Sequence, residues 1–166
     1  RTSGRIDVKA PPRRLLRARL QLMLRHPYLS SAVVRLPFCD ASEFDWCQTA
    51  ATDGYHIFYD RSFFEQLSES ETLFVFAHEL LHVVLGHGDR RGQRDPERWN
   101  IATDLAINRM LVELEFVAPT GVLLDSTFDG LTAEQIYDRL SGPVEKLLEG
   151  LRLGRKGDAS LGHRRS

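Results

Sequence analysis

The chain has 166 residues, of which 42% are hydrophobic and 27% charged, a balance typical of one soluble globular domain. Its two cysteines exclude a disulfide scaffold, and no apolar run approaches the roughly 18–20 residues of a membrane span. The net charge of −1 hides an asymmetry, because residues 1–25 carry +7, residues 152–166 carry +4, and the body between them is acidic. An acidic body disfavours a nucleic-acid groove across the domain. No signal peptide opens the chain, so we expect a cytoplasmic protein without membrane contact.

The first predicted element is an amphipathic helix. An irregular leader ends at Pro11-Pro12, and apolar residues then recur at helical spacing among arginines until Pro27. The residues that carry this period are Leu15, Leu16, Ala18, Leu20, Leu22, Met23 and Leu24.

Three short segments, residues 32–38, 46–51 and 55–59, are rich in β-branched or aromatic residues, and the last of them alternates in hydropathy. Asp53-Gly54 lies between the second and third segments, and this pair tolerates the positive φ that a tight hairpin turn requires. We therefore predict a small antiparallel sheet of three strands.

Two long helices are predicted after the strands. Ser68 or Ser70 can cap a helix over residues 71–85, which Gly86 would end. A polar loop then leads to a second long helix over residues 96–114, with a proline in its first turn.

A last, short helix and the division of the chain complete the prediction. Thr132 and Gln135 form a capping box that opens a helix through Leu140. Strands followed by helices predict the α+β class. We assign residues 1–141 to the domain and residues 142–166 to a C-terminal linker or tail.

The strongest chemical signal is the sequence His-Glu-Leu-Leu-His at residues 78–82, an HExxH motif inside the first long helix. Four residues advance a helix by about 400°, so His78 and His82 lie one turn apart on one face and can bind one metal ion. Glu79 is rotated by about 100° from His78, where it can take a proton from a water held by the metal. This motif, with these roles, is typical of metalloproteases.

The surroundings of the motif support a metal site. The helix is apolar nearly all round, as expected of a helix in the core. Burying two histidines and a glutamate there would cost several kcal/mol unless they were paired, and a bound cation would pair them. The alternative, two core histidines hydrogen-bonded to the backbone, is less favoured.

A catalytic zinc usually takes a third protein ligand, and two residues compete for that place. Asp104 lies 22 residues beyond His82 on the second long helix and shares a face with Asn108. His87 lies five residues after His82, just past Gly86, where the chain can turn back toward the metal. We favour Asp104 as the ligand, and expect His87 and Asn108 to orient a ligand or to face the substrate.

Several further residues at fixed spacings resemble one bacterial family, the metallopeptidase domain found upstream of von Willebrand A-like domains and near MoxR-type ATPases. The resemblance covers about residues 15–141. It rests on the HExxH motif, Gly86-His87, Arg91, the block from Trp99 through Asp104 to Asn108, and the segment from Thr132 to Tyr137.

The resemblance implies a minimal zincin-like fold, in which a small sheet lies against the active-site helix and a second helix brings the third ligand. It implies a zinc metallopeptidase with one Zn²⁺ per chain, a peptide or protein substrate, and a MoxR-type ATPase or von Willebrand A-like domain as partner. An extended substrate would lie along an edge strand, for which residues 55–59 are the expected segment. Glu79 would act as the general base. In gluzincins an ExxxD helix follows HExxH, and Asp104 with Asn108 would be its counterpart with a shorter ligand.

Other interpretations stay open at this stage. A metal-dependent endoribonuclease on a similar fold would want a third histidine at position 88, which is glycine here. A regulatory or scaffold module with a structural zinc would close the site with four protein ligands. A latent protease would need a partner before it became active. The basic run Arg90, Arg91, Arg94 and Arg98 is either a solvated loop or a selector of acidic substrate residues.

Overall fold

Helix α4 (Glu69–Val84) is the central element of the computed structural model, which describes residues 9–149. Ser68 caps the helix: its hydroxyl accepts a hydrogen bond from the Glu71 N–H, and the Glu71 carboxylate accepts one from the Ser68 N–H. This reciprocal pair satisfies two backbone donors that a helix start leaves open. The predicted helix is confirmed, with Ser68 rather than Ser70 as its cap. Gly86 follows it in the left-handed region, at φ 63°.

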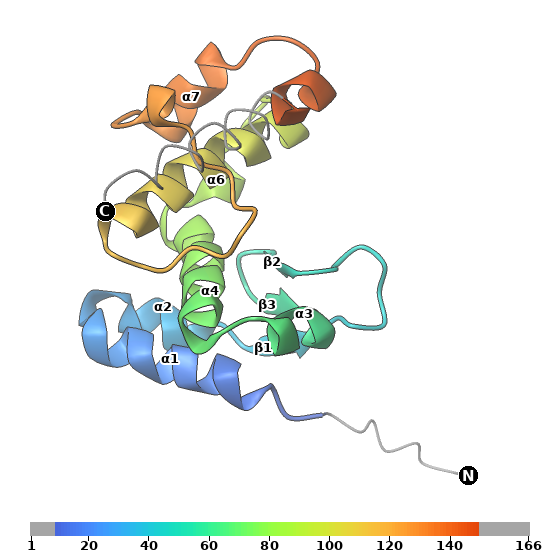
Figure 1. The fold of residues 1–166 in the computed structure, drawn as a ribbon, viewed down its shortest axis with the longest axis vertical. Coiled ribbons are helices and arrows are strands. Elements are labelled where there is room, and N and C mark those ends of the chain that lie inside the picture. The colour runs from blue at the N-terminus through green and yellow to red at the C-terminus, as the bar shows by residue number, and fades with distance from the viewer. Residues whose placement is uncertain (1–8, 150–166) are drawn as a thin grey trace, which may run out of the picture.

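Helix α1 (Arg13–Arg25) packs across α4 and confirms the predicted amphipathic helix. Its buried residues are Leu15, Ala18 and Leu22, whose spacing of three and four places them on one face. They join the main apolar core together with residues of α4 and the sheet. Figure 1 shows α1 and α4 crossing, with the sheet beside them.

The sheet contains three short strands, β1 (Phe38–Asp40), β2 (Ala50–Thr52) and β3 (Ile57–Tyr59), in the order β1-β3-β2. β2 pairs antiparallel with β3 through the predicted hairpin, but β1 pairs parallel with β3. The prediction of an antiparallel sheet is therefore wrong for one of its two pairings. The chain passes from β1 through residues 41–49 to the far edge, and the hairpin then returns β3 into the middle.

Most of the first predicted strand, residues 32–38, is helical instead. The chain forms a 3-10 turn over Pro27–Leu29 and helix α2 (Ser30–Arg35), and only Phe38 enters a strand. The buried residues Leu29, Val33 and Leu36 are spaced by four and three, which is a helical period. Burial at this period outweighs the β propensity of the neighbouring valines.

The position of β3 corrects a second expectation. Residues 57–59 form the central strand of the sheet, so the segment 55–59 cannot offer a free edge to a substrate. β2 is an edge strand, and it lies beside α4. Ile57 and Tyr59 are buried in the main core, and their alternation with Phe58 follows the two-residue period of a strand.

The C-terminal part of the described chain forms a second helical layer. A four-residue helix, α5 (His87–Arg90), opens the segment predicted as a polar loop and leads to α6 (Pro96–Glu113). The side chain of Asp95 caps α6 by accepting from the Arg98 N–H. The Thr132 capping box is present and opens α7 (Ala133–Arg139), which packs along α6.

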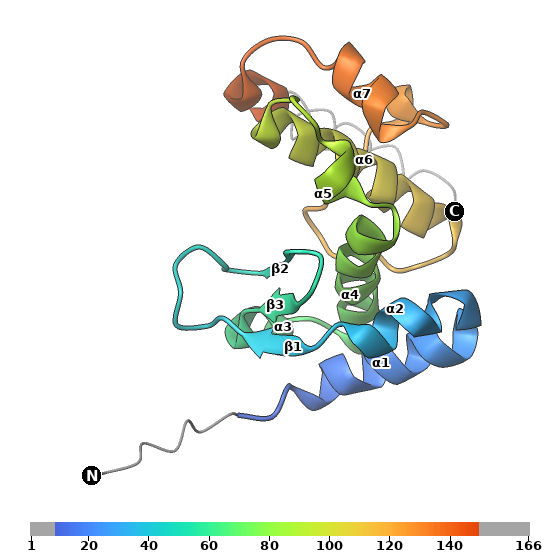
Figure 2. The same cartoon turned by 180° about the vertical axis from the view of Figure 1, so that it is seen from behind.

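Two apolar clusters flank α6. The larger one includes Ile107 and Leu111 of α6 with residues of α1, α4 and the sheet, and the smaller one joins α6 to α7 around Ile101, Leu105 and Ile136. Figure 2 shows α4 between the α1–α2 layer and the α6–α7 layer. Polar residues of α4 that face α6 therefore lie where α4 meets the α6–α7 layer.

The remaining short elements are helix α3 (Arg61–Gln66), after β3, and a 3-10 turn at Ser126–Phe128. Residues 144–149, in the segment expected to be a linker or tail, are helical, and Leu147 and Leu148 pack against the smaller cluster. The rest of that segment, residues 150–166, lies outside the described residues. The division of the chain at residue 141 stays a prediction. None of the helices within residues 9–149 is both long and apolar enough to cross a bilayer.

Candidate metal centre

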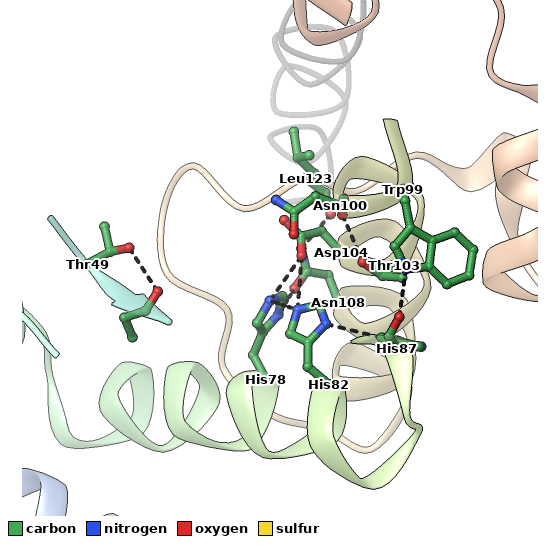
Figure 3. A network of polar contacts seen from close by, with 11 residues as sticks. Thr49, His78, His82, His87, Trp99, Asn100, Thr103, Asp104, Asn108 and Leu123 are labelled. Atoms are coloured by element: carbon green, nitrogen blue, oxygen red, sulfur yellow. Dashed lines mark hydrogen bonds and ion pairs between the residues drawn. The ribbon is translucent and has the colours of Figure 1, made fainter. Parts of the chain in front are cut away.

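Three side chains from α4 and α6 converge on one point. The Nε2 atoms of His78 and His82 are 3.0 Å apart, and the Oδ1 atom of Asp104 lies 3.2 Å from each of them. Figure 3 shows both imidazoles directed from α4 toward Asp104 on α6. Among the residues that the structure describes, this is the one group of three or more His, Cys, Asp or Glu donors close enough to hold a metal ion.

The separations of these donor atoms suit a small divalent cation. Two atoms bound at about 2.0–2.1 Å in a tetrahedral site lie about 3.3–3.4 Å apart, close to the observed 3.0–3.2 Å. Two imidazole nitrogens and one carboxylate oxygen are also the kind of donor set that catalytic zinc takes. The residues present therefore fit the metal that the sequence predicts.

Asn108 fixes the orientation of His78. Its Nδ2 donates to the Leu123 carbonyl at 3.0 Å, so its Oδ1 faces His78 and lies 2.8 Å from Nδ1. Because that oxygen can only accept, the His78 Nδ1 carries the proton and Nε2 is left free to bind a metal. Asn108 thus acts through His78 and lies outside the donor cluster.

His87 plays the matching part for His82. The two Nδ1 atoms are 3.1 Å apart, so His87 contacts the side of His82 that faces away from the donor cluster. The Trp99 indole N–H donates to the His87 carbonyl at 2.8 Å and holds this segment in place. Burial lowers the pKa of His87 to about 4, which keeps its imidazole neutral, so that its Nδ1 can accept a hydrogen bond from the His82 Nδ1–H.

The donor cluster is held by charge as well as by geometry. Burial opposes ionisation of Asp104, but hydrogen bonds from His78 and His82 outweigh it and lower its pKa to about 2. Burial would likewise lower the pKa of His78, yet the Asp104 carboxylate outweighs it and raises that pKa to about 9. A metal that binds here displaces the histidine proton and takes over its pairing with the carboxylate.

Glu79 lies beside the cluster and is only 9% exposed. Burial raises the pKa of its carboxyl group, and the nearby His78 and His82 partly offset this effect. A carboxylate with a raised pKa is better matched to taking and returning a proton near neutral pH than an exposed glutamate is.

A cleft of about 810 Å³ opens onto the donor cluster. One wall is the edge strand β2 with the hairpin turn after it, and the other is the segment that joins α4 to the first turns of α6. The candidate residues that line it are His78, Glu79, His82, His87 and Asp104.

The predicted site residues thus fall into three groups in the structure. His78, His82 and Asp104 form the donor cluster, and Glu79 lies beside them in the cleft. Asn108 and His87 contact the Nδ1 atoms of the two histidines, on the side away from the cluster. Sequence reasoning missed the cleft wall formed by residues 49–52. The Asp-Gly turn at the end of this strand was a usable signal for the hairpin, but the order of the strands could not be predicted from local sequence patterns.

A comparison with family models identifies one match. The family described as "Putative metallopeptidase domain" matches residues 10–165, which is most of the chain. A search of curated proteins and a search of solved structures each found no match.

Proposed function

The chain belongs to this metallopeptidase domain family, and from that premise we propose that it is a zinc-dependent peptidase that hydrolyses peptide bonds with Glu79 as general base. The observation that carries the proposal is the convergence of His78, His82 and Asp104 within 3.0–3.2 Å of one another, beside a buried glutamate and at an open cleft. One Zn²⁺ per chain fits this donor set.

A zinc ion held by these three residues would act as a Lewis acid: it would polarise the substrate carbonyl and lower the pKa of a water bound to the zinc. The chain's own part in the reaction is the handling of the proton. Glu79 accepts a proton at its carboxylate as the water attacks, and returns it to the leaving amine. Asn108 and His87 hold the two imidazoles in the tautomer that leaves each Nε2 free, since both contact Nδ1.

The edge strand β2 supports a peptide as the substrate. Residues 49–52 line the cleft, and the outer edge of this strand is not paired within the sheet. An extended peptide can add to such an edge through backbone hydrogen bonds. These bonds hold the main chain of the peptide and do not depend on its side chains. This position would present a substrate carbonyl to the cleft beside the metal ligands.

A structural zinc in a regulatory or scaffold module is less well supported. Such a site is normally closed by four protein ligands, whereas three donors converge among residues 9–149 and His87 contacts the far side of His82. A latent enzyme that a MoxR-type ATPase or a von Willebrand A-like domain activates would have the same site. Cleavage by the isolated chain separates the active form from the latent one.

The test of the general base is Glu79→Gln in zinc-loaded protein. The amide cannot take a proton, so we expect peptide cleavage to fall by roughly 10²–10⁴-fold while one zinc per chain is retained. Glu69→Gln, at an exposed position in the first turn of the same helix, is the matched control and should keep activity. Cleavage retained in Glu79→Gln would contradict the assigned role.

A further inference from the structure

The cleft beside the donor cluster contains one side chain with a permanent positive charge. Among residues 9–149, Arg91 is the only arginine or lysine that lines it. Apart from a bound metal, this guanidinium is therefore the one fixed positive charge that a peptide in the cleft would meet among the described residues. Arg91 follows α5, on the wall opposite the edge strand β2.

The other three arginines of the basic run are held elsewhere. Arg90 forms a two-pronged ion pair with Glu134, at 2.9 and 2.7 Å. Arg94 donates to the Arg90 carbonyl at 2.9 Å, and Arg98 donates to the Gly142 carbonyl at 2.8 Å. These three side chains therefore tie α5, α6 and α7 together.

The guanidinium of Arg91 has no such partner. It is exposed, and within the described part of the chain it makes no ion pair or side-chain hydrogen bond. Asp89 is two residues away on helical backbone, a spacing at which side chains do not face each other. Asp53, across the cleft, is already engaged by the backbone N–H groups of Tyr55 and His56 and by the His56 ring.

Much of the cleft wall near the donor cluster carries small side chains or none. Residues 49–52 present small side chains on one wall, and Gly86 and Gly88 have none on the other. A strand bound along β2 would be held by its backbone, which is common to all peptides. Selection among peptides then depends on the few long or charged groups at the cleft, of which Arg91 is the cationic one.

We propose that Arg91 selects the substrate by binding one of its carboxylates, so that the preferred peptides are acidic near the scissile bond or end there in a free C-terminus. The inference rests on the proposed peptidase function, whose substrate class it names. A guanidinium binds a carboxylate through two parallel N–H···O bonds, a geometry that an ammonium or an amide cannot reproduce. The carboxylate can come from an Asp or Glu side chain or from the chain terminus.

The experiment measures binding separately from cleavage. The full chain carrying Glu79→Gln is loaded with zinc and titrated with fluorescent peptides by anisotropy. One peptide pair differs by Glu against Gln, with amidated ends; the other lacks acidic residues and differs by a free against an amidated C-terminus. The titrations are repeated with Arg91→Gln added, and with Arg13→Gln added as an exposed arginine on α1 away from the cleft.

We expect one pair to show roughly tenfold tighter binding of its acidic member, lost in Arg91→Gln and kept in Arg13→Gln. The pair that shows the preference identifies the source of the carboxylate. Equal binding within both pairs, a preference that survives Arg91→Gln, or no binding of any peptide would overturn the proposal. Cleavage by the wild-type chain without an acid preference would leave the peptidase function standing alone. An Arg91-dependent preference without cleavage would leave the carboxylate site standing alone.

Discussion

Two positions apart on helix α4, Phe76 and His78 are held in the fold by different forces. Phe76 is fully buried and packs edge-on against Phe38 of β1, with ring centroids 5.3 Å apart. His78 faces α6 and is held by Asn108 and by the charge of Asp104. Two residues rotate a helix by about 200°, so Phe76 and His78 lie on opposite faces of α4. One face stabilises the fold by burying apolar area. The other face carries polar groups whose mutual pairing a bound metal can replace.

This difference means that stability and metal binding can be changed separately. The apolar face is held by close packing, which depends on the volumes of its side chains and binds no ligand. The polar face is held by a few directional hydrogen bonds and ion pairs. Substitutions on the first face should change the free energy of unfolding and leave metal affinity of the folded protein unchanged. Substitutions on the second face should change the metal affinity.

The largest effect is expected at the apolar face. Phe76→Ala removes a fully buried ring and leaves a cavity, which should lower the free energy of unfolding by about 3–5 kcal/mol. Denaturant unfolding of metal-free protein measures the change. Phe44→Ala, at a ring that is 56% exposed, is the matched control and should cost far less. Equal losses in the two variants would show that α4 is not anchored by this face.

An intermediate effect is expected behind the polar face. Asn108→Ala removes the acceptor that holds the His78 Nδ1 proton, which should weaken zinc binding by about 10–100-fold. The zinc affinity is measured by competition with a chelator of known affinity, on protein that circular dichroism shows to be folded. Asn100→Ala, an exposed position on the same helix, serves as control. An unchanged zinc affinity in Asn108→Ala would mean that the imidazole needs no such support.

The smallest effect is expected where α4 begins, remote from both faces. Ser68→Ala removes the hydroxyl that accepts from the Glu71 N–H and should cost about 1 kcal/mol of unfolding free energy. Ser70→Ala, the other capping candidate in the sequence, should be nearly neutral. Zinc affinity should not change in either variant, and a change there would link the two faces that we describe as separable.

The sequence was sufficient for the features that follow from local periodicity. The two imidazoles of the HExxH motif share a face because of the helical repeat, and the caps at Ser68 and Thr132 follow from side-chain chemistry within four residues. Asp104 and Asn108 are likewise one turn apart on α6, and both contact His78. Helix identity and intrahelical spacing were therefore enough to select these groups.

The sequence was not sufficient for features that depend on the path of the chain between helices and strands. Strand order depends on how residues 41–49 pass to the far edge of the sheet, and either order satisfies the same strand propensities. The roles of His87 and Asp104 depend on the direction in which the chain leaves Gly86. The left-handed turn there, at φ 63°, brings His87 to the Nδ1 side of His82 and leaves the Nε2 side to Asp104.

The most direct test of the metal site compares zinc binding in Asp104→Ala and His87→Ala. Both variants are checked for folding by circular dichroism, and zinc content and affinity are then measured by competition with a chelator. Loss of Asp104 removes a donor, so we expect a larger fall in affinity than the about 10–100-fold that removal of an orienting partner such as His87 should cause. Full zinc retention in Asp104→Ala, together with loss in His87→Ala, would contradict the site described above and make His87 the third ligand.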